Sequence, residues 1–422
     1  MFYIVETKEQ LEHLGKPETD TCFINVITLN DNRHPSLTKP CLVYYNDGDK
    51  GYILPIDHSE AFKLDWETVK EFISSIDTVY VLDKKFHLYF LPGNNLSDVN
   101  FINYVDESQF DTKVHTDFNN QKYYIDDLNS LIPIPKHYEK WENIYAYLKD
   151  KLYFSKWYTN YRSEFLDTFT NVFYQIEKNG IGIDPHKFNK HFETTWKDNS
   201  IYGNIVYTQY NLYNLTTRPS NAFNGVNYAA LPKDSARESF EPNNYIFVEF
   251  DYSAYHPRII AKMIGYTFEG EPYDEVPKEI MFQNIYGGIR DEYAWFPFFA
   301  KLNEWLDNRW KEFNSTYINS LVLPSGVTIG KLKIENPNKN KILSYLIQSY
   351  ETYYNTLTLE RVLKLLDGKK TKIVLYTYDS ILLDVAKEDI KTLLPKIKQE
   401  LEADGFPTRM SVGENYGALV KK

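Results

Sequence analysis

The chain has 422 residues, of which 43% are hydrophobic and 16% aromatic, with 36 tyrosines. This composition is sufficient for hydrophobic cores in two or three domains and excludes an intrinsically disordered chain. The formal net charge of −11 argues mildly against a nucleic-acid partner, although a local basic groove in an acidic protein would still accept one.

Cysteine content and hydropathy indicate a soluble intracellular protein. Only Cys22 and Cys41 are present, which gives neither a disulfide framework nor a zinc-ligand pattern, so a reducing compartment is expected. The sequence has no run of 18 apolar residues, and its first residues do not resemble a signal peptide. We therefore expect a cytoplasmic location, in the host cytoplasm if a phage encodes the chain, and no membrane partner.

The first 100 residues alternate short apolar runs with turn residues. Residues 65–76 are a predicted helix with Asp65 as its N-cap. This alternation is typical of an α/β or α+β domain. Pro133 and Pro135 mark its expected end, which gives a first domain at residues 1–140. The expected strands cover residues 22–29, 41–45, 51–56, 78–82 and 87–91.

Further along the chain, helical patterns alternate with apolar strands. A helical pattern over 139–179 ends at Asn179-Gly180, which is a typical C-cap. Another helix is expected to begin near Pro257. Residues 276–288 form a predicted short helix with Pro277 in its first turn, and 336–368 form one helix or two. Strands are expected at 245–251, 372–377 and 381–385, the last two forming a hairpin.

Two aspartates, Asp251 and Asp379, end apolar strands where the chain turns. If these strands lie side by side, both carboxylates meet at one end of a sheet and offer the oxygen ligands that Mg²⁺ prefers. Two such ions about 4 Å apart can activate an attacking hydroxyl and stabilise a leaving phosphate oxygen. For each aspartate taken alone, the alternative is an ordinary turn or N-cap residue.

A second group of candidate residues lies on the predicted helix 276–288. Lys278, Phe282 and Tyr286 recur at i, i+4 and i+8 and therefore share one face. A cation and two aromatic rings on one stripe suit the binding of a triphosphate and the stacking of a base. The alternative is an amphipathic core stripe with a lysine that reaches to solvent.

Taken in chain order, these segments resemble the family A DNA polymerases, the bacterial DNA polymerase I type. The resemblance covers roughly residues 160–420, and its strength comes from the order of many matches. IEKNGIGID (176–184) is similar to E-x-N-G-I-x-V-D, GNIVYTQYNLYNLTTRPS (203–220) to G-x-V-x-T-x-Y…T-x-R-x-S, NYAALP (227–232) to N-L-Q-N-I-P, and ARESFEP (236–242) to R-x-x-F-x-x-P. FVEFDYSAYHPRI (247–259) lies at motif A, D-Y-S-x-I-E-x-R, and KEIMFQNIYGG (278–288) at motif B, K-x-x-x-F-x-x-x-Y-G. LIQSYET (346–352) resembles M-Q-G-T-A-A-D, LYTYDSILLDV (375–385) lies at motif C around V-H-D-E, and VGENYG (412–417) resembles the closing G-x-N-W.

The resemblance implies a right-hand polymerase of the α+β or α/β class, preceded by an RNase H-like exonuclease-type domain. The polymerase domain would cover residues 141–422. Its much reduced thumb would lie at about 160–215, its palm at about 203–260 and 315–422, and its fingers at about 261–314.

The family's chemistry is attack of a primer 3′ hydroxyl on the α-phosphate of a dNTP, with release of pyrophosphate. The resemblance implies that Asp251 and Asp379 are the catalytic residues and the ligands of two Mg²⁺ ions, with Mn²⁺ as an alternative. The implied nucleotide-binding residues are Lys278, Phe282, Tyr286, His256 and Arg258. The implied DNA-binding residues are Arg218, Asn227, Gln348 and Tyr378, the last near the primer terminus.

The N-terminal region resembles the family's 3′–5′ exonuclease domain, beginning with FYIVETKEQLEHL (2–14). That nuclease needs four carboxylates around two metals. Here FINVITL (23–29) has no acid where D-x-E belongs, and His87 stands at the aspartate of N-x-x-[FY]-D, with Asp83 at its asparagine. YEKWE (138–142) resembles the Y-x-x-x-D element, with Glu142 at the position of its aspartate. We expect a domain that keeps the fold and has lost the nuclease.

The polymerase region is also reduced, as in a compact phage-like member. Only residues 185–215 separate Asp184 from Thr216, where the family has a long helical thumb that grips DNA phosphates. With the net charge of −11, this predicts weak, strongly salt-sensitive DNA binding and low processivity, unless a processivity or replisome protein supplies the grip.

Three substitutions distinguish the chain from the family pattern. Asp274 stands where the family has a triphosphate-binding arginine, so that contact is lost or comes from elsewhere, with Lys262 and Arg290 as candidates. Ser380 replaces the glutamate of motif C. His256 replaces the steric-gate glutamate that packs against the sugar, and the alternative for it is a partly exposed histidine in the first turn of a helix.

The leading hypothesis is therefore a DNA-directed DNA polymerase that acts on a primer-template with dNTPs and lacks proofreading. A second hypothesis is a polymerase with relaxed sugar selection, primase-like or gap-filling, because imidazole at the gate is able to hydrogen-bond a ribose hydroxyl. A third is a non-catalytic scaffold or nucleic-acid-binding relative. The sequence does not separate replication from repair.

Overall fold

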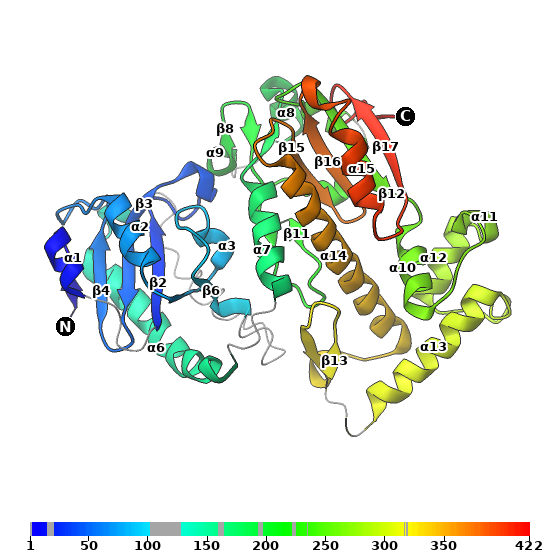
Figure 1. Ribbon diagram of the computed structural model, residues 1–422, viewed down its shortest axis with the longest axis horizontal. Helices are drawn as coiled ribbons and strands as arrows, with labels where there is room; N and C mark the ends of the chain where they lie inside the picture. The colour runs from blue at the N-terminus through cyan, green and yellow to red at the C-terminus, as the bar shows by residue number, and fades with distance from the viewer. Residues whose placement is uncertain are drawn as a thin grey trace. The chain divides into compact units, whose positions relative to one another are not determined.

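The computed structural model describes residues 2–14, 21–101, 128–158, 164–192, 197–221, 225–233, 235–315, 317 and 320–422, without side chains at 21, 150–158 and 197–198. These residues form two compact units (Figure 1). The first unit contains the described residues up to 158 together with 197–202. The second contains residues 164–192 and the described residues from 203 to 422.

The first unit is built on a six-stranded mixed sheet with the order β1-β4-β3-β2-β5-β6. β2, β3 and β4 are antiparallel, whereas β5 and β6 run parallel to β2. The strands are β1 (Tyr3–Ile4), β2 (Thr21–Thr28), β3 (Pro40–Asn46), β4 (Gly51–Pro55), β5 (Thr78–Val81) and β6 (Leu96–Asp98). The helices are α1 (Lys8–Leu14), α2 (Trp66–Ser74), α3 (Lys84–His87), α6 (Ile134–Tyr158) and α9 (Lys197–Ser200), and the short strand β8 covers Ile201–Tyr202.

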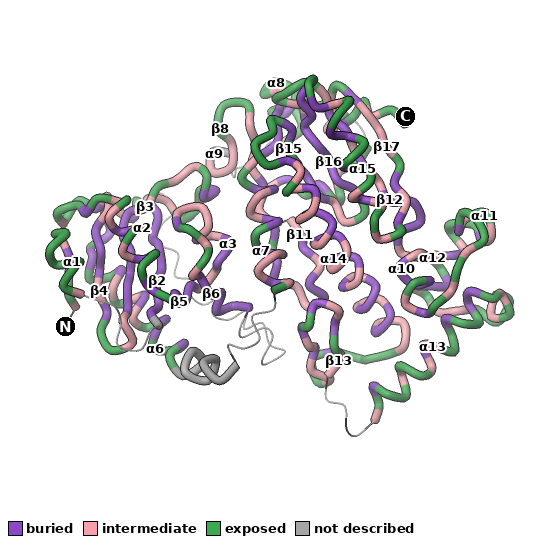
Figure 2. Tube along the Cα trace, in the orientation of Figure 1, coloured by how far each residue is buried: buried purple, intermediate pink, exposed green. Residues whose placement is uncertain are grey.

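β2 is buried along its length, as its purple trace in Figure 2 shows, and its alternating residues belong to two cores. Ile24 and Val26 pack in one core, with α2 residues such as Ile73. Phe23 packs in the other core, with Leu148 of α6. Because α6 contributes to this core, the first unit extends past the boundary expected at residue 140.

Most of the predicted elements of the first unit are confirmed, including the N-cap of α2, where Asp65 Oδ2 accepts from Thr68 N at 2.9 Å. The strand expected at 87–91 is wrong, because residues 84–87 form the helix α3. Asp83 Oδ1 accepts from Phe86 N at 3.0 Å and caps this helix, so a local hydrogen bond overrides the apolar pattern. Part of the first domain, residues 102–127, lies outside the described residues.

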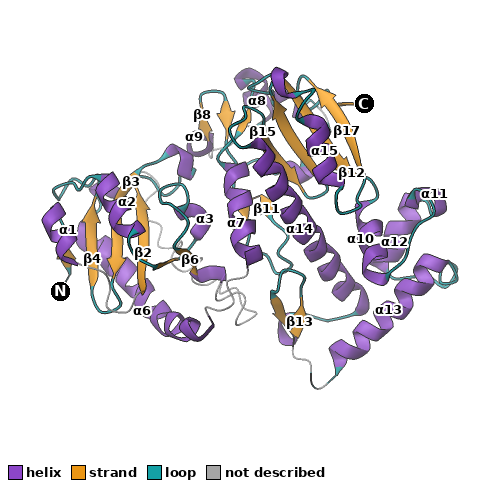
Figure 3. Ribbon diagram, in the orientation of Figure 1, coloured by secondary structure: helices purple, strands orange, loops and turns teal. Residues whose placement is uncertain are grey.

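The second unit is built on a five-stranded antiparallel sheet with the order β15-β16-β12-β17-β18, shown in Figure 3. Its strands are β12 (Ile246–Tyr252), β15 (Lys372–Thr377), β16 (Ser380–Val385), β17 (Thr408–Gly413) and β18 (Val420–Lys421). Short strands accompany it at β7 (Ile181–Gly182), β9 (Ile205–Val206), β10 (Tyr210–Asn211), β11 (Ser220–Asn221), β13 (Ser320–Val322) and β14 (Thr328–Gly330). The central strand β12 and the β15–β16 hairpin were expected from the sequence.

The helices of the second unit are α7 (Glu164–Glu177), α8 (Pro185–His191), α10 (Tyr255–Ile264), α11 (Pro272–Glu275), α12 (Lys278–Gly287), α13 (Pro297–Asn314), α14 (Lys339–Leu366) and α15 (Leu394–Glu402). The segment 336–368 is therefore one helix of 28 residues, α14, which lies beside α7, α10, α12 and α15. α10, α12 and α13 share a core with α14 that includes Ile260, Met281 and Phe298.

The reduction expected between Asp184 and Thr216 agrees with the described residues of that segment. Their only helices are α8, with seven residues, and α9, with four. Residues 193–196, within the expected thumb, lie outside the described residues, as do 160–163. None of the helices in the described parts of the chain is long and apolar enough to cross a membrane.

Candidate active site

Asp251 and Asp379 come from neighbouring strands at one end of the second sheet. β12 and β16 pair antiparallel, with Asp251 directly opposite Ser380, the residue that follows Asp379. Tyr252 N donates to the Asp379 carbonyl at 2.9 Å and fastens the hairpin turn to β12. Tyr378 adopts the left-handed conformation that this tight turn requires, with a φ of 64°. The structure thus brings the two aspartates together as predicted.

The surroundings of Asp251 and Asp379 disfavour the ionised forms of both carboxyl groups. Burial raises the pKa of both side chains, and the negative charge of Asp251 raises that of Asp379 further. The cations Lys233, Arg409 and Lys278 lower the pKa of Asp251, but burial outweighs them. Among the described residues, no side chain donates a hydrogen bond to either carboxylate or forms an ion pair with it.

A third acid, Glu249, lies two residues before Asp251 and so points to the same face of β12. Ser380 Oγ donates to Glu249 Oε1 at 3.3 Å, and burial followed by the Asp251 charge raises the pKa of Glu249. The motif comparison missed this residue. The signal for it was the period-2 spacing of two acids on an otherwise apolar strand.

These carboxylates fit divalent metal ions of the Mg²⁺ type. They are hard oxygen donors whose mutual repulsion a cation would relieve. Within the described chain, no group of three or more His, Cys, Asp or Glu side chains is placed to hold one metal. A site of this kind would therefore depend on two carboxylates together with substrate phosphates and water, which is a usual arrangement for Mg²⁺.

The stripe on α12 lies at the edge of the protein core, with Phe282 and Tyr286 half-buried. Met281, Asn284 and Ile285 are the buried residues of this helix, whereas Lys278 is exposed. Lys278 Nζ lies 5.9 Å from the centre of the Phe282 ring, which is 5.8 Å from that of Tyr286. An open cavity of about 610 Å³ is lined by Phe282, Gln283, Tyr286, Gly287, Gly288 and Arg290. The core-stripe alternative therefore holds in part, because Tyr286 packs against the core, whereas Lys278 reaches solvent.

His256 in the first turn of α10 is held from two sides. Its Nδ1 lies 2.5 Å from the hydroxyl of Tyr286, and its Nε2 lies 3.3 Å from Glu351 Oε1. The ring also lies beside Phe282, with centroids 6.3 Å apart. His256 thus belongs to the same surface as the α12 stripe, and it is partnered rather than a free histidine at a helix end.

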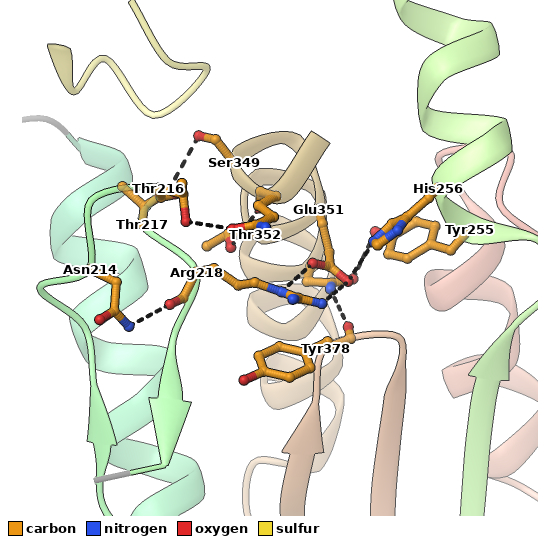
Figure 4. A network of polar contacts seen from close by, with 12 residues as sticks. Asn214, Thr216, Thr217, Arg218, Tyr255, His256, Ser349, Glu351, Thr352 and Tyr378 are labelled. Atoms are coloured by element: carbon orange, nitrogen blue, oxygen red, sulfur yellow. Dashed lines mark hydrogen bonds and ion pairs between the residues drawn. The ribbon is translucent and has the colours of Figure 1, made fainter. Parts of the chain in front are cut away.

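Arg218 and Tyr378, two of the implied DNA-binding residues, are in contact (Figure 4). Arg218 stacks on the ring of Tyr378, with Cζ 3.6 Å from its centre, and pairs with Glu351, with Nε 2.7 Å from Oε2. Gln348 Oε1 accepts from Thr216 Oγ1 at 3.0 Å. Glu351, which joins Arg218 to His256, was not identified from the sequence.

Asn227 and Arg258 have other described partners. Asn227 is exposed and caps a short 3-10 turn, where its Oδ1 accepts from Ala230 N at 3.3 Å. Arg258 donates from Nε to the carbonyl of Ser253 at 3.1 Å and pairs with Glu271 at 3.1 Å. The described contacts therefore do not bring Asn227 into the group around Arg218, and they give Arg258 the role of bracing the turn after β12.

The two candidates for the missing phosphate contact are committed to other partners. Lys262 Nζ donates to the carbonyl of Asp404 at 3.1 Å. Arg290 donates a hydrogen bond to Gln283 Oε1 at 2.7 Å and pairs with Glu292 at 3.2 Å.

By contrast, Arg409 on β17 lies directly opposite Asp251 and is exposed, and the described chain shows no side-chain ion pair or hydrogen bond for it. No motif pointed to Arg409, because only the strand register places it there.

In the first unit, the residues at the expected nuclease positions make structural hydrogen bonds. His87 Nε2 accepts from Val26 N at 3.1 Å, and its Nδ1 lies 2.6 Å from the carbonyl of Asp83. Burial lowers the pKa of His87 to about 4, so the ring is neutral at pH 7. Glu142 Oε2 accepts from Tyr44 at 2.6 Å.

Neither a protein-family model nor a curated protein matches this chain. Among solved structures, the chain is similar to the POL domain of Pol1 from M. smegmatis, in a complex with DNA primer-template and dNTP. The TM-score is 0.69 at 12% sequence identity, and the match covers 99% of this chain and 100% of that chain. The chain therefore has the fold of a family A DNA polymerase domain, which confirms the predicted fold class.

Proposed function

We propose that this chain is a DNA-directed DNA polymerase that extends a primer 3′ end with dNTPs by two-metal phosphoryl transfer. The observation that carries the proposal is the pairing of β12 with β16, which sets Asp251 and Asp379 at one sheet end, close enough for their charges to interact. The solved structure with the same fold binds primer-template and dNTP, which supports this function.

In this proposal, Asp251 and Asp379 hold two Mg²⁺ ions, or Mn²⁺ in their place. When bound, such ions lower the pKa of the attacking hydroxyl and neutralise charge on the leaving phosphate. The protein's own contribution is to hold both carboxylates at one sheet end, where burial disfavours their ionised forms and bound cations would favour them. Glu249 adds negative charge beside Ser380, where the family pattern has its third acid.

The nucleotide would lie between the sheet end and α12. Lys278 is the candidate phosphate contact on the helix, and we assign a second phosphate contact to Arg409, since it faces Asp251 and has no described competing partner. Phe282 and Tyr286 offer aromatic faces on which the base can stack. His256 is the candidate contact to the sugar.

The primer terminus would lie against Arg218, Gln348 and Tyr378. Because the described thumb segment is short and the net charge is −11, few phosphate contacts are expected. Binding to the primer-template should therefore weaken steeply with salt, and a processivity protein is an expected partner. We also propose that the nuclease is lost, and the structural hydrogen bonds of His87 and Glu142 support this.

Primer extension with Mg²⁺ and dNTPs tests this function. The wild-type chain should extend a labelled primer, and Asp379→Ala should abolish extension. Asp367→Asn, a change to an exposed aspartate after the end of α14, is the matched control and should retain activity. If neither the wild type nor Asp379→Ala extends the primer with any metal, salt concentration or added partner, the result would instead support a non-catalytic nucleic-acid-binding relative.

The second candidate function, a polymerase with relaxed sugar selection, is favoured by one observation. His256 presents an imidazole, held by Tyr286, where the family pattern has a carboxylate. If this ring is the gate, His256→Ala should raise incorporation of rNTPs relative to dNTPs. If the ratio of rNTP to dNTP incorporation is unchanged, another residue selects the sugar, with Tyr255 and Tyr286 as candidates. Tyr286 is then favoured, because Tyr255 is buried and donates to Asn355 Oδ1 at 2.8 Å.

A further inference from the structure

Glu351 is a fully buried carboxylate in the middle of α14. Burying a carboxylate is costly unless it is paired and hydrogen-bonded. Burial alone raises the pKa of Glu351, but the hydrogen bond from His256 and the charges of His256 and Arg218 outweigh burial, so its pKa lies below the ordinary value. Glu351 is therefore an ionised group with two specific partners.

Those partners belong to different parts of the proposed site. Arg218 Nε and one terminal nitrogen lie 2.7 Å and 3.3 Å from the two carboxylate oxygens, and Arg218 stacks on Tyr378 at the expected primer end. On the other side, His256 Nε2 lies 3.3 Å from Oε1 at the expected sugar position. Figure 4 shows one carboxylate between the arginine and the histidine.

The sequence explains why a carboxylate stands there. Aligned with the family patterns, position 256 corresponds to the glutamate of D-Y-S-x-I-E-x-R, and position 351 corresponds to an alanine of M-Q-G-T-A-A-D. In this chain the acid is absent at 256 and present at 351. Because His256 and Glu351 are in contact, α14 supplies a carboxylate next to the position at which the family pattern has its glutamate, and this carboxylate also pairs with Arg218.

The contact also fixes the state of the His256 ring. An ionised Glu351 only accepts hydrogen bonds, so His256 Nε2 must carry the hydrogen that it donates. Nδ1 then accepts from the Tyr286 hydroxyl, 2.5 Å away, when the ring is neutral, and donates to it when the ring is protonated. With both ring nitrogens occupied, the ring cannot turn without losing two hydrogen bonds.

We propose that Glu351 is a positioning residue for sugar selection, which fixes His256 as the gate and holds Arg218 at the primer end through the same carboxylate. The proposal rests on the polymerase function, and it names the residue that determines how strictly this site prefers deoxyribose. It also predicts that positions 256 and 351 are functionally exchangeable as a pair.

The test is an exchange of the two residues. We compare wild type, Glu351→Ala, Glu351→Gln, His256→Glu and the double variant His256→Glu with Glu351→Ala. Replacing Glu351 removes the hydrogen-bond partner of His256. This should lower the preference for dNTP over rNTP by about tenfold to hundredfold, the effect of losing a hydrogen bond to a charged group. His256→Glu alone places two carboxylates in contact and should impair extension. The double variant should recover both extension and sugar preference.

Glu360→Gln is the control, since Glu360 lies on the same helix and pairs with Lys364 on the surface. It should leave the sugar preference unchanged. If Glu351→Ala and Glu351→Gln slow extension but keep the wild-type ratio, Glu351 is only structural and the proposal is wrong. Failure of the double variant to recover the ratio would also overturn it.

A binding assay separates this proposal from the polymerase function itself. The affinities for dATP and ATP are measured with a dideoxy-terminated primer-template, which permits no chemistry. If the wild type fails in primer extension but binds dATP more tightly than ATP, and Glu351→Ala loses that preference, the positioning role stands while the catalytic proposal fails. An unchanged preference in Glu351→Ala contradicts the positioning role in this assay too.

Discussion

The ion pair of Arg218 and Glu351 gives the sharpest prediction about stability. Arg218 Nε lies 2.7 Å from Glu351 Oε2, with the Glu351 side chain 0% exposed and that of Arg218 25% exposed. Removing one partner of a buried ion pair costs about 3–5 kcal/mol, because the other charge stays buried without compensation. Arg218→Met leaves Glu351 with His256 alone, so we expect destabilisation of about 3 kcal/mol.

Glu351→Leu should cost less, about 2 kcal/mol, since Arg218 is partly exposed and is able to turn toward water. The double variant Arg218→Met with Glu351→Leu should be within about 1 kcal/mol of wild type, because apolar residues of similar volume replace both charges. The two effects are therefore strongly non-additive.

Hydrogen exchange of α14, residues 339–366, measures this effect locally and avoids the assumption that both units unfold together. The free energy of opening at neutral pH should follow the order wild type, double variant, Glu351→Leu, Arg218→Met. Because the pKa of Glu351 is lowered in the folded chain, the stabilisation is present above its ordinary value of 4.5 and is lost as the pH falls further. The coupling is refuted if each single variant lowers the free energy of opening by less than about 1 kcal/mol, or if the loss in the double variant equals the sum of the two single losses.

Three further predictions concern the site and the first unit. Arg409→Ala should raise the KM for dNTP about tenfold, with kcat less affected, because a charge contact to phosphate is lost. Arg409→Lys keeps the charge and should recover much of this loss. If steady-state kinetics give an unchanged KM for Arg409→Ala, Arg409 does not contact the nucleotide. Asp379→Asn should raise the Tm of the metal-free chain near pH 7, because the raised pKa of Asp379 makes its ionised form destabilising. Mg²⁺ should raise the Tm of wild type more than that of this variant, and equal shifts in thermal unfolding would speak against metal binding at Asp379. A labelled single strand incubated with Mg²⁺ and no dNTP should keep its length, whereas steady shortening from its 3′ end would show an active nuclease.

Motif order and strand ends made part of the site predictable. Asp251 and Asp379 each close an apolar strand, and the structure places these strands side by side. The choice of Arg218, Asn227, Gln348 and Tyr378 as DNA-binding residues came from the resemblance alone, since no local pattern connects residues so far apart in the chain. Their roles in binding DNA stay predictions.

The parts that the sequence did not reveal depend on long-range packing. Glu351 lies on a helix with buried residues along its whole length, so no polar face marks it as special. Arg409 reaches the site only through the pairing of β17 with β12. Pro135 was taken with Pro133 as a sign of a domain boundary, but it lies in the first turn of α6, where proline is well tolerated.

Primer extension by wild type and Asp379→Ala, with Mg²⁺ and dNTPs at low salt, tests the central claim most directly. The account predicts templated extension by the wild type and none by the variant, with Asp367→Asn active. Extension that survives in Asp379→Ala would contradict the assignment of Asp379 to the metal site. Failure of the wild type under every condition, while it still binds primer-template, would contradict the polymerase function.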